Sequence, residues 1–214
     1  MSKPIGLFGG TFDPVHLGHL LAAQEAHERL DLARIILMPA HIRPHKERAV
    51  ATPPADRLAM LRLAVDNDRR FEVSDLEIQR GGPSYTIDTL VALRALTGGD
   101  VVLLLGSDSV PELPAWRRVG ELLDLCTLVV MARPGFTLAN LDPLRAALPA
   151  RQVERIRLLP IPLIEISSTD VRARLAAGRP VRYLVPPAVE DYIARRGLYR
   201  PETPSKPGGR ETVS

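Results

Sequence analysis

The fold is decided by the stretch IGLFGGTFDPVHLGH at residues 5–19. Residues 4–8 form an apolar run that predicts a buried strand, ended by Gly9 and Gly10, and residues 17–30 carry apolar side chains at helical spacing. A strand, a glycine turn and a helix N-terminus bring backbone amides and the positive end of a helix dipole to one place. The stretch therefore predicts a turn that binds phosphate groups.

Two histidines mark this helix start. His16 and His19 are three residues apart, so both rings can leave one face of the first turn, and Gly18 between them leaves room for a bulky anion. The stretch is not a P-loop, because no Gly-Lys-Ser/Thr follows, and its glycine spacing differs from the dinucleotide-binding fingerprint. Zinc binding is disfavoured, since Cys126 is the only thiol and no further ligand has a matching spacing. A histidine pair that merely caps a helix is the alternative.

The rest of the chain alternates short apolar runs with helical patterns, which predicts an α/β fold. We expect a doubly wound, mainly parallel sheet with helices on both faces and a small C-terminal helical part. The predicted strands are residues 35–38, 71–78, 101–105, 128–131 and 156–159, and the predicted helices are residues 55–65, 85–96, 169–177 and 187–196.

Local signals mark the ends of several elements. Ser84 is expected to cap the helix at 85–96, which Gly98 and Gly99 end. Residues 1–200 are expected to form one domain, and the Pro/Gly/Ser-rich residues 201–214 a disordered tail. In such a fold, ligands bind beyond the carboxyl ends of the strands, where the strand order reverses. Residues 9–19, 39–46 and 106–108 occupy such positions.

Composition narrows the class of protein. Only 4% of the residues are aromatic, so the core must be aliphatic. Residues 195–214 hold five basic and two acidic residues, an excess equal to the whole net charge of +3, which argues against a nucleic-acid partner. A single cysteine in an apolar run, Cys126, together with the lack of a leader pattern, predicts a reducing, cytoplasmic location. No apolar stretch has the roughly 18 residues of a membrane span.

A second polar motif, ISSTDVR, occupies residues 166–172. Ser167, Ser168 and Thr169 form a polar helix start that can offer hydroxyls and amides to an anion. Arg172 follows within the first turn and can place its guanidinium on phosphate oxygens. Taken alone, the motif is more typical of a capped helix with a solvated arginine, but together with the first motif it favours phosphate binding.

The two motifs together carry a family resemblance. GGTFDPVHLGH at residues 9–19 resembles the opening motif of the His-x-Gly-His nucleotidyltransferases, and its full form is similar to that of bacterial nicotinate-nucleotide adenylyltransferases. The resemblance runs from about residue 5 to residue 199 and includes residues 166–172. It implies a Rossmann-like nucleotidyltransferase fold. It also implies the transfer of AMP from ATP to nicotinate mononucleotide, giving deamido-NAD and pyrophosphate in NAD biosynthesis.

The resemblance also implies roles for individual residues. The implied catalytic residues, which act on the phosphates, are His16, His19, Lys46 and Arg172. The implied ATP-binding residues are Gly9, Gly10, Thr11, Phe12, Gly18, Gly106, Asp108, Ile166, Ser167, Ser168 and Thr169. The implied mononucleotide-binding residues are Asp13, His45, Ser84, Tyr85, Thr86, Trp116 and Arg133.

Some of these residues have a second interpretation. Trp116 follows two prolines in a turn-prone stretch and is expected to stack on the pyridine ring, although a lone Trp is usually a core residue. Asp108 can accept hydrogen bonds from ligand hydroxyls or cap the next helix. His41 and Arg43, in the basic loop at residues 40–54, fit a phosphate site or a solvated loop equally well.

The expected partners are ATP and nicotinate mononucleotide, with no nucleic acid and no membrane, and homo-oligomerisation is left open. Mg²⁺ is expected to travel on the ATP phosphates and waters, with no metal site built by the protein. Two other functions remain open at this point. One is an adenylyltransferase for another phosphate, such as nicotinamide mononucleotide or phosphopantetheine, and the other is an ATP sensor without turnover.

Overall fold

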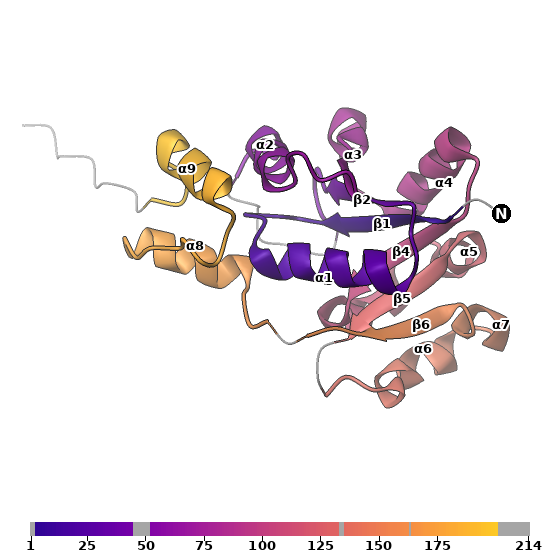
Figure 1. Cartoon of the computed structure of the whole chain (residues 1–214). Helices are drawn as coiled ribbons and strands as arrows, with labels where there is room; N and C mark the ends of the chain where they lie inside the picture. Colours follow the sequence, from indigo (N-terminus) through magenta and orange to yellow (C-terminus); the bar gives the residue numbers. More distant parts are fainter. Residues whose placement is uncertain (1–2, 45–51, 133–134, 163, 201–214) are drawn as a thin grey trace, which may run out of the picture.

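The structure is a computed structural model that describes residues 3–44, 52–132, 135–162 and 164–200. A parallel sheet lies between two layers of helices (Figure 1). Its strands in the described part of the chain are β1 (Ile5–Gly10), β2 (Arg34–Pro39), β3 (Phe71–Val73), β4 (Val101–Gly106), β5 (Thr127–Ala132) and β6 (Ile156–Pro160).

Helices connect the strands and complete the C-terminal part. The α-helices are α1 (Leu17–Arg29), α2 (Pro54–Ala64), α3 (Leu76–Arg80), α4 (Thr86–Thr97), α5 (Val119–Leu125), α6 (Asp142–Ala147), α7 (Ala150–Val153), α8 (Ser168–Ala176) and α9 (Pro187–Arg196). Two 3₁₀ helices, η1 (Ser107–Ala115) and η2 (Leu138–Leu141), follow β4 and β5.

The sheet reverses its winding direction at its centre. The strand order is β3-β2-β1-β4-β5-β6, and every neighbouring pair is parallel. The chain moves outward from β1 to β3 and then returns to place β4 on the other side of β1. A crevice therefore opens beyond the carboxyl ends of β1 and β4, next to Gly10 and Gly106. The predicted doubly wound parallel fold is confirmed.

Two aliphatic cores fill the space between the sheet and its helices. Alternate residues of β1 point to opposite faces, so that Leu7 belongs to one core and Phe8 to the other. The Leu7 core includes buried residues of α4 and α5, and the Phe8 core includes buried residues of α1, α2, α8 and α9. The C-terminal helices therefore share a core with α1, the helix that begins between His16 and His19.

Two predicted boundaries are wrong. The first strand does not end at the glycines, because Gly9 and Gly10 continue the ladder and pair with Met38 and Pro39 of β2. Residues 71–78 are not extended throughout, since β3 ends at Val73 and α3 begins at Leu76. Helix α3 buries a carboxyl side chain, an arrangement that the apolar pattern of this segment does not indicate.

The sequence patterns also missed several short helices. Helix η1 contains two prolines, and α5, η2, α6 and α7 each span no more than seven residues. Segments of this length are too short to display a helical period clearly. The predicted tail at residues 201–214 lies outside the described residues.

Cys126 is a small buried side chain, as the apolar run around it predicts. The thiol is buried at the end of α5, and burial raises its pKa to about 12. The side chain therefore behaves as a small apolar group rather than as a reactive thiolate. Among the helices of the described segments, none combines the length and apolarity that a membrane crossing needs.

Candidate active site

A cavity of about 640 Å³ lies at the crevice between the two halves of the sheet. Its volume is within the usual range for small-molecule sites. Most residues predicted for the site line this cavity: Gly9, Gly10, Thr11, Phe12, Asp13, His16, Gly18, His19, Ser84, Tyr85, Thr86, Gly106, Asp108, Trp116, Ile166, Ser167, Ser168, Thr169 and Arg172. His45, Lys46 and Arg133 lie outside the described residues.

The two histidines face one another across the first turn of α1. Their ring centroids are 3.7 Å apart with an interplanar angle of 28°, so the rings are stacked. The Phe12 ring packs edge-on against the His19 ring, with centroids 5.0 Å apart. The predicted placement on one helix face is confirmed.

The same histidines also cap the helix. The backbone N–H of His16, the N-cap residue, donates to Nδ1 of His19 at 3.3 Å, and together they form a capping box. In a neutral imidazole one nitrogen accepts and the other carries the proton. Because Nδ1 of His19 accepts, the proton of the neutral ring is on Nε2, where it can be donated to a ligand oxygen. Capping and ligand binding are therefore compatible at His19.

Glycine is needed at different positions of the motif for different physical reasons. A Cβ at Gly18 would lie 3.1 Å from two atoms of the His16 ring, and a Cβ at Gly10 would lie 2.9 Å from the Phe12 ring. These two glycines make room for the protein's own rings, and Gly18 also lines the cavity where the anion is expected. A Cβ at Gly9 would meet nothing within 4 Å, so the backbone there is open to a close ligand.

The helix start offers fewer amides than the sequence suggested. The first helical N–H, that of Leu17, donates to the carbonyl of Leu184 at 2.9 Å, and the N–H of His19 donates to the carbonyl of His16 at 3.0 Å. Two of the first-turn amides therefore already have acceptors within the protein.

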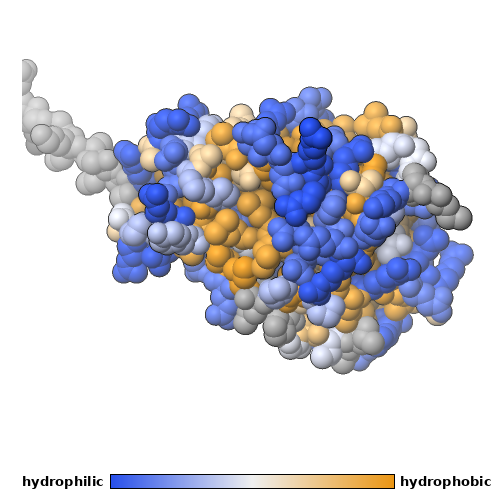
Figure 2. Space-filling view, in the orientation of Figure 1, coloured by the Kyte–Doolittle hydropathy of each residue, from blue (hydrophilic) through white to orange (hydrophobic). Residues whose placement is uncertain are grey.

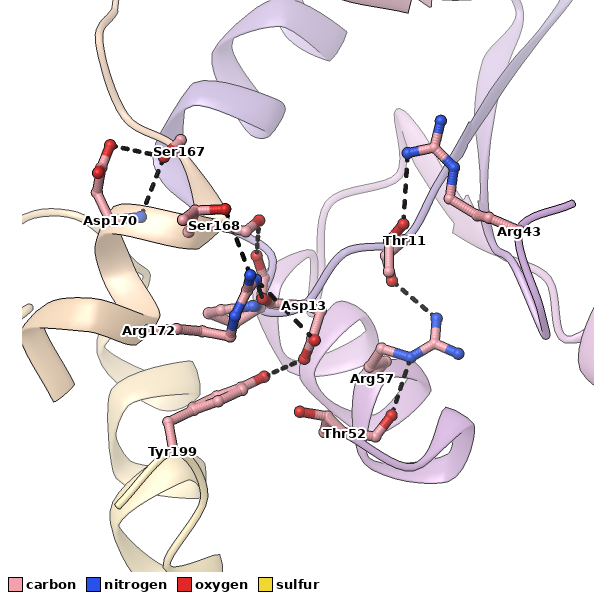
Figure 3. A network of polar contacts seen from close by, with 12 residues as sticks. Thr11, Asp13, Arg43, Thr52, Arg57, Ser167, Ser168, Asp170, Arg172 and Tyr199 are labelled. Atoms are coloured by element: carbon pink, nitrogen blue, oxygen red, sulfur yellow. Dashed lines mark hydrogen bonds and ion pairs between the residues drawn. The ribbon is translucent and has the colours of Figure 1, made fainter. Parts of the chain in front are cut away.

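The second motif reaches the loop that precedes the histidines (Figure 3). Ser167 caps α8 by accepting the N–H of Asp170 at 3.1 Å, as the polar helix start predicts. Ser168 donates to the carbonyl of Pro14 at 2.9 Å, and Nη1 of Arg172 donates to the carbonyl of Asp13 at 2.6 Å. Arg172 is thus a half-buried contact between the two motifs and not a solvated arginine.

The other end of the cavity is formed by the start of α4 and the end of η1. Trp116 is half-buried: it packs against the core and also lines the cavity. Ser84 does not cap α4, whose N-cap is Tyr85 without a side-chain hydrogen bond. The Ser84 hydroxyl instead accepts the backbone N–H of His41 at 2.9 Å and hydrogen-bonds to Glu77. Ser84 therefore joins α3, α4 and the loop after β2.

Asp108 is exposed at the mouth of the cavity. It lies in the first turn of η1, after the N-cap residue Gly106, and gives no side-chain cap. A Cβ at Gly106 would lie 2.6 Å from Oδ1 of Asp108, so the glycine lets this carboxylate fold over the end of β4. The capping alternative for Asp108 is not supported.

Two arginines that line or support the cavity escaped the sequence analysis. Arg57 of α2 is fully buried, and burial lowers its pKa; its guanidinium donates to the carbonyls of Thr11, His41 and Thr52. Arg117 lies 4.6 Å from the ring centroid of Tyr85 and adds a cation at the Trp116 end. No local sequence pattern reveals these arginines, because each contacts residues that are distant from it along the chain.

Two residues of the basic loop, Arg43 and His41, make different contacts. Arg43 lines the cavity, and its Nη1 donates to the hydroxyl of Thr11 at 3.5 Å. His41 instead turns its Nδ1 to the carbonyl of Gly82 at 3.1 Å. Arg43 thus stays a candidate for phosphate contact, whereas His41 stabilises the loop.

The cavity combines polar and apolar walls. On the face drawn in Figure 2, apolar side chains gather around the first turns of α1. Leu17 is 36% exposed there, and Leu21, Ile161 and Ile164 contribute to the cavity lining. Within the described part of the chain, no group of three or more His, Cys, Asp or Glu side chains is placed to hold a metal ion. The arrangement suits a nucleotide with an apolar base and an anionic phosphate chain.

Comparison with known proteins agrees with this geometry. The Cytidylyltransferase-like family matches residues 7–174. A probable nicotinate-nucleotide adenylyltransferase of Thermomicrobium roseum is 45% identical over 92% of this chain and 91% of its own. One from a Roseiflexus species is 46% identical over 93% of this chain and 99% of its own.

Solved structures share the fold. Plasmodium falciparum nicotinic acid mononucleotide adenylyltransferase, complexed with APC, superposes with a TM-score of 0.70 at 19% identity and covers 92% of this chain and 97% of its own. The same protein complexed with NaAD also gives a TM-score of 0.70, at 20% identity and the same coverage. From the motifs, the topology and the curated relatives, we conclude that this chain belongs to the nicotinate-nucleotide adenylyltransferase family.

Proposed function

We propose that this protein is an adenylyltransferase that joins the AMP part of ATP to nicotinate mononucleotide, releasing pyrophosphate and forming deamido-NAD for NAD biosynthesis. One observation carries the proposal: the stacked His16 and His19 line the same cavity as Arg172 and Trp116. A polyphosphate site and an aromatic ring site are thereby part of a single cavity of about 640 Å³, which suits two nucleotides reacting with each other.

The reaction is a direct displacement. An oxygen of the mononucleotide 5′-phosphate attacks the α-phosphorus of ATP, and the bond from that phosphorus to the bridging oxygen of the β-phosphate breaks. The attacking phosphate is already an anion, so the protein need not supply a nucleophile or a strong base. Its task is to align the two phosphates and to neutralise the charge that grows on pyrophosphate.

The residues around the cavity divide this task. Nε2 of His19, the His16 ring and the Arg172 guanidinium are assigned to the phosphates, and Lys46 joins them by family resemblance. Mg²⁺ carried on the phosphates would add positive charge and fix their geometry, and the donors of the described residues suit a phosphate-borne ion better than a protein cage. We place the reaction in the cytoplasm. This compartment is reducing, and the free, buried Cys126 thiol is compatible with it.

The acid is favoured over the amide by charge at the ring end of the cavity. Arg117 lies against the Tyr85 ring and lines the cavity together with Trp116, and it forms an ion pair with Asp88 at 3.8 Å. Glu77 also lines this end, but burial raises its pKa and thereby disfavours its charged form. The Arg117 cation therefore supports a preference for a carboxylate over a carboxamide on the pyridine ring.

A substrate panel tests the proposal. Pyrophosphate release is measured with MgATP and either nicotinate mononucleotide, nicotinamide mononucleotide or phosphopantetheine. We expect kcat/KM to be highest for the acid, by about tenfold or more over the amide, which corresponds to about 1.4 kcal/mol. Faster release with phosphopantetheine would assign the protein to another phosphate. ATP binding by calorimetry without any product would identify a sensor and contradict the proposal.

A further inference from the structure

Four side chains from distant parts of the sequence hold the loop between β1 and the histidines. They act on Thr11, Asp13 and Pro14, and three of them donate to backbone carbonyls (Figure 3). The four contacts are Arg57 Nη1 to the Thr11 carbonyl at 2.8 Å, Arg172 Nη1 to the Asp13 carbonyl at 2.6 Å, Ser168 Oγ to the Pro14 carbonyl at 2.9 Å and Tyr199 Oη to Asp13 Oδ1 at 2.6 Å.

Tyr199 makes the one contact of these four that reaches a side chain. It lies three residues beyond α9 and has a left-handed φ of 61°, so the chain turns to direct its ring back toward the first motif. Burial, followed by its hydrogen bond to Asp13, raises the pKa of Tyr199 well above its usual value. The hydroxyl is therefore protonated at neutral pH and donates to Asp13 Oδ1 at 2.6 Å.

Asp13 has little access to a ligand. Its residue is 4% exposed, Oδ1 accepts from Tyr199, and Oδ2 lies 4.0 Å from Nη1 of Arg172. A buried carboxylate that loses its donor either pays a desolvation cost or draws in the nearest cation. That cation is Arg172, which the proposed function assigns to phosphate. Tyr199 thus gives Oδ1 of Asp13 a close donor, while the Arg172 guanidinium lies no nearer to this carboxylate than 4.0 Å.

We infer that Tyr199 is a positioning residue for adenylyl transfer, acting through Asp13 on the loop that places His16 and Arg172. Asp13 is accordingly a support of the loop, whereas family resemblance had suggested a contact to the mononucleotide. This inference rests on the proposed function. Residues 197–200, which follow α9, therefore contribute to the site through Tyr199 without touching a substrate.

The chain offers a matched control for this inference. Tyr192 of α9 also donates its hydroxyl to a buried aspartate, Asp56 of α2, at 2.7 Å, and Asp56 is 4% exposed. Tyr192→Phe and Tyr199→Phe each remove one hydroxyl donor to a buried carboxylate. They differ in that only Tyr199 acts on the loop before His16, and in that Asp56 keeps a second donor, Nε of Arg196 at 3.1 Å.

The experiment compares the two variants with wild type by turnover, by ATP affinity from calorimetry and by melting temperature. We expect Tyr199→Phe to lower kcat by about 10- to 100-fold, since small misplacement of reacting groups has effects of this size. Its ATP dissociation constant should rise several-fold, while KM for the mononucleotide changes by less than about twofold. Tyr192→Phe should lose a similar amount of melting temperature and keep kcat and ATP affinity near wild type.

An Asp13→Asn variant tests whether Tyr199 acts through the carboxylate. If it does, adding Tyr199→Phe to Asp13→Asn lowers kcat little further, because coupled positions are not additive. Equal kcat in Tyr199→Phe and Tyr192→Phe, or multiplicative effects with Asp13→Asn, would overturn the inference. If the wild-type protein is inactive on nicotinate mononucleotide, the proposed function is wrong. The ATP affinities of the two tyrosine variants then still test the role of Tyr199 independently.

Discussion

The two histidines at the start of α1 combine a structural and a chemical task in different ring atoms. Nδ1 of His19 accepts the N–H of His16, which leaves the proton of the neutral ring on Nε2. The stacked arrangement at 3.7 Å brings both rings to one wall of the cavity. A substitution at His19 therefore removes a helix cap and a phosphate donor together, and an informative experiment must separate them.

Replacing His19 tests the phosphate role at the scale of one residue. His19→Ala is expected to lower kcat by about 100-fold, the usual effect of losing one donor to a charge that grows in the transition state. Affinity for the mononucleotide should change far less, since the ring lies at the helix start and not beside Trp116. Steady-state kinetics and mononucleotide titration provide both values.

His19→Glu separates the two tasks. Glutamate is the standard residue at this position of a capping box, so it restores the helix cap, but its negative charge repels phosphate. We expect a melting temperature near that of wild type and a kcat no higher than that of the alanine variant. Recovery of turnover in His19→Glu would mean that His19 acts only as a cap.

At this scale, the sequence was informative where a residue acts on its near neighbours. The spacing of His16 and His19 and the cap at Ser167 follow from helix geometry alone, and both are present. Arg57 and Tyr199 were missed, because their partners are 46 and 186 residues away along the chain. Nothing in a local pattern distinguishes these side chains from an ordinary surface arginine or a terminal tyrosine.

At the scale of elements, the contact between α3 and α4 contains a buried acid. Glu77 of α3 accepts the Thr89 hydroxyl of α4 at 2.6 Å, and burial raises its pKa above the ordinary value of 4.5. In the pH range from that value up to the raised pKa, the native protein binds more protons at Glu77 than the unfolded chain does. The free energy of unfolding contributed by this group therefore falls as pH rises through this range.

Glu77→Gln tests this relation. The glutamine keeps an acceptor for Thr89 and carries no charge, so the variant should gain stability relative to wild type as pH rises from 4 to 8. Urea unfolding at pH 4, 6 and 8 measures the difference. Glu72→Gln is the control, because Glu72 is half exposed and paired with Arg34, and it should show no such gain. A flat difference for Glu77→Gln would contradict the buried-acid interpretation.

The same elements show where apolar patterns mislead. Residues 71–78 contain enough apolar side chains to resemble one strand, but the ladder ends at Val73 and the chain turns into α3. Ser84 precedes a helix and has the right chemistry for a cap, yet its hydroxyl bridges His41 and Glu77. In both places a tertiary contact overrides the local preference of the segment.

At the scale of the whole molecule, the strand–helix alternation was sufficient to predict the architecture. A parallel sheet with the order β3-β2-β1-β4-β5-β6 needs a reversal beside β1, and the glycine motif at the end of β1 lies there. The apposition of α8 and the segment after α9 on the first motif was not predictable, since it depends on how the two cores pack. The site is therefore assembled from both ends of the described chain.

The most direct test of the central claim is a crystal structure with Mg²⁺ and a non-hydrolysable ATP analogue. We predict phosphate oxygens within about 3.2 Å of the His16 and His19 rings and of the Arg172 guanidinium, inside the cavity at the ends of β1 and β4. A triphosphate bound elsewhere, with the two imidazoles turned away from it or chelating a metal between them, would contradict the account.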